Sequence, residues 1–212
     1  MAAVIDYTNP AREAALKSLS FLKPRARRDD ERKGRALRAW DGSSLLGARN
    51  RALLGVMFCC GLRQAELAAL TWDDVDLEQS IIRVRHGKGD KSRHVPSYGD
   101  FTPAALRAWR SLAGKDRQYV FPRMFAGDVI GDDAPITTDG VFHVIQETIK
   151  RTGDPFSPHD ARRTFTTEAL ATGHTLADVQ ADADHKRPDT TLDYAQPSQA
   201  VERRQRGRLR YG

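Results

Sequence analysis

The sequence predicts a mainly helical α+β domain with one small antiparallel sheet, and three observations lead to that fold class. Apolar side chains between Leu45 and Leu70 recur with the period of an α-helix. Two β-rich runs, residues 81–85 and 92–96, flank a connection that contains two glycines, which is typical of a β-hairpin. A Ser or Thr followed directly by Pro, a common helix start, occurs twice further along the chain.

The N-terminal third is expected to contain an arm followed by two helices. Residues 1–40 are rich in basic side chains and interrupted by prolines, so they are interpreted as a basic arm or linker with a short helix near residues 12–22. The periodic segment begins at Leu45. Gly61 is expected to end its first helix, because glycine tolerates the left-handed backbone that follows many helices. A second helix covers residues 63–70.

The predicted hairpin is followed by more helix. Thr102 precedes a proline, so its hydroxyl is expected to cap a helix that ends near Leu112. Residues 119–122 form a short extended piece. Residues 138–151 carry apolar side chains at helical spacing and form the next helix.

The same kind of start signal opens the next helix. Ser157 precedes a proline, and this helix is expected to run to Ala169. Thr175 begins one more helix, with Asp178 placed three residues later to complete a capping box. A short turn starts at Pro188.

Length and composition exclude several classes of protein. The chain has 212 residues, which corresponds to one or two domains and is enough to bury a core. Its longest apolar run, residues 52–62, is about half the length of a membrane-spanning helix, so no membrane partner is expected. Cys59 and Cys60 are the only cysteines, too few for a disulfide framework or a set of metal ligands, and they suit the reducing cytoplasm.

Basic charge is concentrated at the two ends of the chain. The formal net charge is +6, yet residues 23–38 carry +5 and residues 203–210 another +5, which leaves the body mildly acidic. Two basic ends around such a body favour a polyanionic partner, of which nucleic acid is the commonest. The alternative is that these segments only increase solubility.

Two pairs of residues have the chemistry of a phosphate site. His159 and Arg162 are three residues apart in a predicted helix, so they share one face beside a helix N-terminus that attracts anions. Arg63 and Glu66 have the same spacing, and Glu66 could hold the Arg63 guanidinium in a fixed orientation. The alternatives are an ordinary surface His–Arg pair and a surface ion pair that contributes about 0.3–0.5 kcal/mol.

Three further residues could take part in chemistry. Lys88 lies between two glycines at the tip of the predicted hairpin, from which it could reach a ligand, although most such lysines are only solvated. His185 precedes the turn at Pro188. Tyr194 lies among small polar residues rather than in an apolar stripe, which leaves its hydroxyl available.

The order of these residues resembles that of the tyrosine recombinases, the phage integrase family. The likeness extends over roughly residues 45–200 and rests on the following segments: Gly61-Leu-Arg-Gln-Ala-Glu-Leu67, Gly87-Lys88-Gly89, Ser157-Pro-His-Asp-Ala-Arg162, His185 and Tyr194. The resemblance implies a recombinase catalytic domain over residues 41–198. It also implies that the basic tail, residues 199–212, docks on a neighbouring protomer.

The same resemblance implies a site-specific DNA recombinase or integrase. Tyr194 would attack a DNA phosphate and form a 3′-phosphotyrosyl link, while Arg63 and Arg162 would hold the non-bridging oxygens. His159 would exchange a proton near the tyrosine, and Lys88 would protonate the departing 5′ oxygen as general acid.

His185 would hydrogen-bond the phosphate, with Glu66 in a supporting role. The implied partners are double-stranded DNA and three further copies of the chain in a tetramer on that DNA. Neither a metal nor a nucleotide cofactor is expected, and the implied location is the cytoplasm, in action at the nucleoid.

One residue departs from the family pattern. Glycine usually precedes the second histidine, whereas this chain has Asp184, with Asp182 close by. Two carboxylates near the phosphate pocket are expected either to repel DNA, to pair with Arg162, Lys186 or Arg187, or to turn away from the pocket.

The length of the chain also departs from the pattern. Most members carry a separate helical core-binding domain of about 100 residues before the catalytic one, and residues 1–40 are too few for it. The chain is therefore expected to be a catalytic fragment or a naturally short member, with a basic interdomain linker at its start.

Two other functions are kept as alternatives. One is a non-catalytic DNA-binding protein on a decayed recombinase scaffold, for which Asp184 would be a sign of decay. The other is a metal-dependent phosphohydrolase that uses His159, Asp160, Asp182, Asp184 and His185 as ligands. The second alternative leaves Arg63, Lys88 and Tyr194 without a role.

Overall fold

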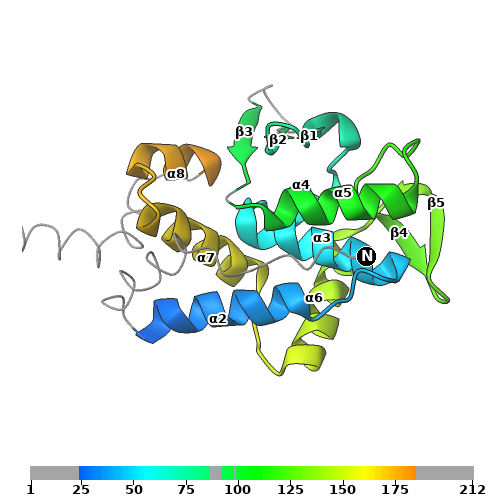
Figure 1. Cartoon of the computed structure of the whole chain (residues 1–212), viewed down its shortest axis with the longest axis horizontal. Coiled ribbons are helices and arrows are strands. Elements are labelled where there is room, and N and C mark those ends of the chain that lie inside the picture. The colour runs from blue at the N-terminus through cyan, green and yellow to red at the C-terminus, as the bar shows by residue number, and fades with distance from the viewer. Residues whose placement is uncertain (1–23, 86–91, 98, 185–212) are drawn as a thin grey trace, which may run out of the picture.

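The computed structural model describes residues 24–85, 92–97 and 99–184 (Figure 1). Within them the chain is mainly helical with small antiparallel sheets, the fold class that the sequence predicts. The short helix expected near residues 12–22 lies outside the described residues. None of the helices in the described part combines the length and apolarity that crossing a bilayer requires.

The central element is helix α3, Leu45–Cys59, which is buried on nearly all sides. A helix that is apolar all round belongs in the middle of a core, where other helices cover it. Helix α5, Phe101–Ala113, and helix α7, Pro158–Ala171, both pack on it. The side-chain oxygen of Ser44 caps its N-terminus by accepting a 3.0 Å hydrogen bond from the backbone of Gly47. The predicted helix of this segment is therefore confirmed.

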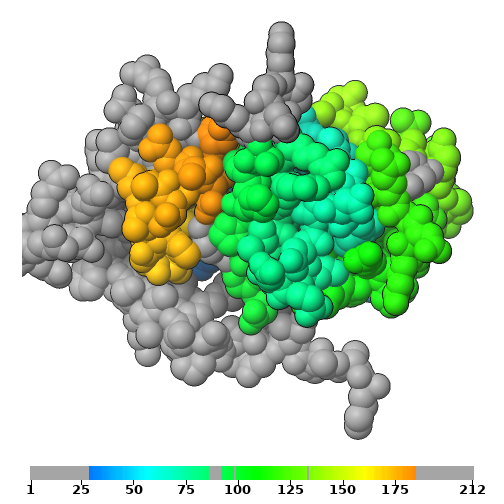
Figure 2. Space-filling view, turned by 90° about the horizontal axis from the view of Figure 1, so that it is seen from above, coloured from blue at the N-terminus to red at the C-terminus, as the bar shows by residue number. Residues whose placement is uncertain are grey.

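The remaining predicted helices are present with small shifts in their ends. Helix α4 spans Gln64–Ala68 and is followed by a 3-10 turn, η2, at Trp72–Asp74. Helix α6 spans Thr138–Thr152, and helix α8 spans Leu176–Asp182. Seen from above, α8 lies against the region of strand β3, Arg93–Pro96 (Figure 2).

The predicted hairpin is the main part of a three-stranded sheet. Strand β2, Ile81–Val84, pairs antiparallel with β3, and β1, Val75–Asp76, adds a short outer strand. The register places Ile82 opposite Val95, and both side chains are buried beneath the sheet.

A second hairpin was missed by the sequence analysis. Strands β4, Pro122–Phe125, and β5, Val129–Pro135, form a two-stranded sheet with an irregularity in register. The β5 segment contains Gly131, two aspartates and Pro135, which are all depleted in strands, so its composition concealed it.

Helix α2, Pro24–Arg38, lies where the sequence analysis expects an arm or linker. It packs on α3, α6 and α7, and along one edge of the molecule in Figure 1. Ala36, Leu37 and the following Trp40 are buried, and Trp40 Nε1 donates a 2.9 Å hydrogen bond to Thr148 Oγ1. The dense charge of this segment made its short apolar face hard to recognise. From Asp29 onward the described chain belongs to the packed body.

Two of the three expected helix caps are present. Ser157 and Asp160 cap α7 reciprocally, and Thr175 Oγ1 accepts a 3.2 Å hydrogen bond from the backbone of Asp178. The expected cap at Thr102 is wrong, because α5 begins earlier and Asp100 occupies the N-cap position. The Thr102 hydroxyl is instead buried in the first turn without a hydrogen-bond partner.

Candidate active site

The turn after α3 brings two distant segments into contact at Gly61. This residue has φ of +61°, and a Cβ there would lie only 2.8 Å from Cγ of Phe165 on α7. A glycine is therefore required twice, for the left-handed backbone and for the close approach of the ring. The approach allows Arg162 Nη1 to donate a 2.6 Å hydrogen bond to the carbonyl oxygen of Gly61.

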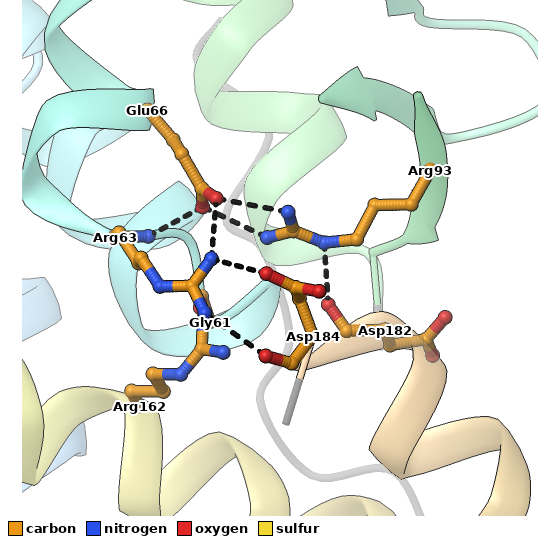
Figure 3. A network of polar contacts seen from close by, with 7 residues as sticks. All are labelled: Gly61, Arg63, Glu66, Arg93, Arg162, Asp182 and Asp184. Carbon is orange, nitrogen blue, oxygen red and sulfur yellow. Dashed lines mark hydrogen bonds and ion pairs between the residues drawn. The ribbon is translucent and has the colours of Figure 1, made fainter. Parts of the chain in front are cut away.

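Arg63 and Glu66 form the contact that their spacing predicts (Figure 3). Arg63 is the N-cap residue of α4, and its backbone N–H donates to Glu66 Oε2 at 2.8 Å. Its Nη1 also donates to Glu66 Oε1 at 3.0 Å. The carboxylate therefore fixes both the backbone and the side chain of Arg63.

Arg93 holds the same carboxylate from strand β3. Its two terminal nitrogens donate to the two oxygens of Glu66 at 2.8 Å each, a bidentate arrangement that suits a planar guanidinium. Its Nε donates to the backbone oxygen of Asp182, at the end of α8, at 2.9 Å. One side chain thus connects β3, α4 and α8.

Glu66 is a saturated anion rather than a proton carrier. Burial acts to raise its pKa, but the hydrogen bonds from Arg93 and from the backbone of Arg63 outweigh burial and lower the pKa to about 2. Its two oxygens accept four hydrogen bonds, which is about all that a carboxylate can accept. Glu66 therefore orients its neighbours and stays ionised.

Arg162 is buried and incompletely satisfied. Its Nη2 has no hydrogen-bond partner, although the residue is only 8% exposed. The pKa of Arg162 is lowered to about 10, mainly by burial and also by the positive charge of Arg63, while Glu66 acts in the opposite direction. An unsatisfied buried guanidinium is costly and is typical of a site that awaits an anion.

Asp184 lies beside Arg63, which corrects the sequence analysis. Its Oδ2 accepts from Arg63 Nη1 at 2.6 Å, and its backbone oxygen accepts from Nη2 at 2.9 Å. Asp184 is therefore not turned away from the pocket, and its partner there is Arg63 rather than Arg162. Lys186 and Arg187, the other expected partners, lie outside the described residues. Asp184 follows α8 with φ of +45°, a value uncommon outside glycine.

The structure places only part of the predicted set. Arg63, Glu66 and Arg162 come together, and His159 is exposed in the first turn of α7, three residues before Arg162. Lys88, His185 and Tyr194 lie outside the described residues. Arg93 was missed, although its position offers a signal. It shares a strand face with the buried Val95, where a charged side chain needs an ionic partner.

Two carboxylates of the alternative metal site, Asp160 and Asp184, take part in other contacts. The Asp160 carboxylate caps α7 and pairs with Arg163, while Asp184 pairs with Arg63. Among the described residues, no group of three or more His, Cys, Asp and Glu is arranged to hold a metal.

The arrangement as a whole is suited to an oxyanion. Three guanidinium groups, from Arg63, Arg93 and Arg162, meet two carboxylates, from Glu66 and Asp184, so cations are in excess. Arg93 is directed to Glu66, whereas Arg63 and Arg162 lie next to one another with donors directed away from Glu66 (Figure 3). Such a pair can hold the oxygens of a phosphate and stabilise added negative charge.

Comparisons with known proteins find relatives in one family. The sequence profile of the phage integrase family matches residues 34–200. Tyrosine recombinase XerC of Lacticaseibacillus casei (strain BL23) is 33% identical over 169 residues, which cover 75% of this chain and 54% of the relative. The chain therefore spans about half the length of that relative.

Two solved structures have the same fold. The crystal structure of XerA recombinase has a TM-score of 0.68 and 26% identity, with 84% of this chain and 65% of that one covered. XerH site-specific recombinase, solved in a post-cleavage complex with its palindromic difH substrate, has a TM-score of 0.65 and 24% identity, with 81% of this chain and 50% of that one covered.

Proposed function

Because the chain belongs to the phage integrase family, we propose that it cleaves and rejoins DNA strands as a site-specific recombinase. The observation that carries the proposal is the buried, unpartnered nitrogen of Arg162 beside Arg63. A duplex DNA phosphate supplies the oxygens that this pair lacks, and XerH is a relative in fold that is seen on its DNA substrate after cleavage.

In the proposed reaction, Tyr194 attacks the scissile phosphorus and forms a 3′-phosphotyrosyl link. Arg63 and Arg162 hold the non-bridging oxygens, where negative charge increases in the transition state. His159 exchanges a proton near the tyrosine, Lys88 protonates the departing 5′ oxygen, and His185 hydrogen-bonds the phosphate. These five roles and the nucleophile follow from the family resemblance of the motifs.

The energetics favour a reversible reaction. The covalent link preserves the energy of the phosphodiester bond, so a 5′ hydroxyl of a second strand can attack it and restore a continuous backbone. The positioning of Arg63 by the saturated carboxylate of Glu66 supports this chemistry, since the guanidinium need not reorganise when charge develops.

The test is covalent trapping on nicked suicide duplexes. Duplexes that bind the chain are first selected from a random-sequence pool, then nicked so that the released 5′ strand diffuses away. The expected product is an SDS-stable, protease-sensitive protein–DNA adduct that forms in EDTA and is absent with Tyr194→Phe. Tyr119→Phe, a change of the same kind at a tyrosine of the body, is expected to retain the adduct.

Each of the other possible outcomes would favour one of the alternative functions or exclude Tyr194 as the nucleophile. Tight binding without an adduct on any selected duplex would overturn the proposal in favour of a non-catalytic DNA-binding protein. Cleavage without an adduct that stops in EDTA would favour the metal-dependent phosphohydrolase. An adduct that persists with Tyr194→Phe would remove Tyr194 as the nucleophile.

The assembly on DNA is a second part of the proposal. Four copies act together, and the tail of residues 199–212, with five arginines between 203 and 210, docks on a neighbouring protomer. Light scattering of the protein–DNA complex should give the mass of four chains on two duplexes. Removal of residues 199–212 should reduce it to the mass of separate complexes, and an unchanged mass would contradict the docking.

A further inference from the structure

We propose that Asp184 is a built-in competitor for the phosphate: its carboxylate occupies a donor of Arg63 that a DNA phosphate needs and must leave it before both terminal nitrogens of Arg63 can bind DNA. This inference rests on the proposed function for the identity of the anion. It assigns Asp184 a role in setting affinity for the substrate.

The geometry shows which donors are taken. Arg63 Nη1 gives one N–H to Glu66 Oε1 and another to Asp184 Oδ2. Its Nη2 donates to the backbone oxygen of Asp184. A phosphate that binds Arg63 end-on, through one N–H of each terminal nitrogen, uses the same two groups as Asp184, so the phosphate and Asp184 compete for them.

Exposure decides which of the two carboxylates can leave. The Glu66 side chain is 10% exposed and accepts four hydrogen bonds, so its release would leave buried charges unpaired. The Asp184 side chain is 36% exposed and its contact with Arg63, itself 43% exposed, is an ion pair at the surface. Such pairs contribute little to stability in water, so a DNA phosphate can displace the carboxylate.

The backbone of Asp184 adds a second reason. Its φ of +45° places it in the left-handed region after α8, and its N–H donates to the carbonyl of Ala181 at 3.0 Å. This conformation is disfavoured for a residue with a Cβ, although Asp and Asn adopt it more readily than most. Asp184 therefore makes its contact with Arg63 from a mildly strained backbone conformation.

Removing the carboxylate also changes the charge that DNA meets. With Asp184 in place, three guanidinium groups face two carboxylates, and without it they face one. The local excess of positive charge rises by one unit, next to the unpartnered nitrogen of Arg162. Both effects act in the same direction, toward tighter binding of a polyanion.

The test compares Asp184→Asn with Asp184→Gly. Asn keeps the shape of the side chain and tolerates the left-handed backbone, so it removes the charge alone, whereas Gly also removes the strain. The probe is one duplex selected for binding to the unmodified chain, at a fixed salt concentration. Asp184→Asn is expected to bind about two- to fivefold tighter, the range that corresponds to a surface ion pair, and Asp184→Gly at least as tightly.

Two controls separate competition from general electrostatics. Asp116→Asn makes the same charge change at an exposed position in the loop after α5 and measures the non-specific gain. A double-mutant cycle with Arg63→Gln isolates the pair. The gain from Asp184→Asn is expected to disappear when Arg63 is absent. Melting temperatures of all variants check that the fold persists.

The outcomes distinguish this inference from the proposed function. An affinity no higher than that of Asp116→Asn, or an equal gain in the Arg63→Gln background, overturns the competition. A gain that depends on Arg63 without any covalent adduct keeps the competition and removes the recombinase. An adduct with unchanged affinity in Asp184→Asn keeps the recombinase and removes the competition.

Discussion

Two regions of the molecule are built from the same kinds of charged residue and differ in how fully those charges are paired within the chain. Between α2 and α7, Lys33 pairs with Glu168, and Arg163 pairs with Asp29 at 3.3 Å and with Asp160 at 3.0 Å. Glu168 Oε1 is also buried without a hydrogen-bond partner, but its carboxylate is held in an ion pair by Lys33. In the cluster of Arg63, Glu66, Arg93, Arg162 and Asp184, by contrast, Arg162 donates to a backbone oxygen, one of its buried nitrogens has no hydrogen-bond partner, and Asp184 has a positive φ. The first region joins helices, and the second is arranged for a ligand.

The contrast is sharpest at two neighbouring arginines. Arg162 and Arg163 follow one another on α7 and therefore point to different faces of the helix. Arg163 faces carboxylates of its own chain. Arg162 instead donates to the backbone oxygen of Gly61, and the positive charge of Arg63 lies close enough to lower its pKa. Pairing with carboxylates of the chain thus distinguishes Arg163, which has a structural role, from Arg162, which is a candidate catalytic residue.

The largest effect is expected at these two arginines. Arg162→Gln should slow covalent adduct formation by about 10²–10³-fold at saturating DNA, because one donor to the developing charge is lost. Arg163→Gln should leave the rate within a few fold and lower the free energy of unfolding. Single-turnover cleavage and urea unfolding measure the two quantities, and the reverse pattern would contradict the assignment.

The next effect concerns the glycine that brings α7 to the site. Gly61→Ala should lower the free energy of unfolding by about 2–4 kcal/mol, from the left-handed backbone and from crowding against Phe165. The matched control is Gly153→Ala, which has a φ of +73° but no atom near the added Cβ. It should lose only the backbone part, about 1–2 kcal/mol. Equal losses would mean that Phe165 is not in contact.

A smaller effect is expected from pH through Glu66. Its pKa of about 2 in the folded chain lies below the ordinary value for Glu, so its contribution to stability is complete above about pH 4.5 and is lost as pH falls toward 2. The contribution amounts to about 3 kcal/mol. The stability of the unmodified chain should therefore fall more steeply than that of Glu66→Gln over this range. Parallel urea-unfolding curves at pH 7, 5, 4 and 3 would contradict the assigned pairing.

The smallest effect on stability is expected at the ion pair that connects helices α2 and α7. Lys33→Met combined with Glu168→Leu should change the free energy of unfolding by less than about 1 kcal/mol, since an apolar pair of similar size can replace a buried ion pair. Lys33→Met alone should cost about 3–5 kcal/mol, because it leaves the Glu168 charge buried without its partner. Adduct formation should persist in the double variant. A strong loss of cleavage there would show that the two regions are coupled.

Most local features of the sequence were predicted correctly, apart from the cap at Thr102 and the β4–β5 hairpin, whereas contacts between distant segments were not. Three correctly predicted features each involve residues a few positions apart: the period of α3, the start of α7 after Ser157, and the contact of Arg63 with Glu66. Each follows from helix geometry, which fixes the neighbours of a residue at three and four positions along the chain.

The missed features depend on long-range packing. Lys33 meets Glu168 across 135 residues, and Arg63 meets Asp184 across 121 residues. Neither spacing leaves a periodic signal, so α2 was taken for an arm and the partner of Asp184 was not foreseen. Arg93 meets Glu66 across 27 residues, and its inward position on β3 is the one local hint of that contact.

The central claim is that Arg63 and Arg162 bind a DNA phosphate while Arg93 and Arg163 stay with carboxylates of the chain. Nuclear magnetic resonance of arginine Nε–Hε groups, recorded before and after addition of a selected duplex, tests it most directly. The resonances of Arg63 and Arg162 should shift on binding, and those of Arg93 and Arg163 should stay in place. Binding that leaves Arg63 and Arg162 unshifted would contradict the account.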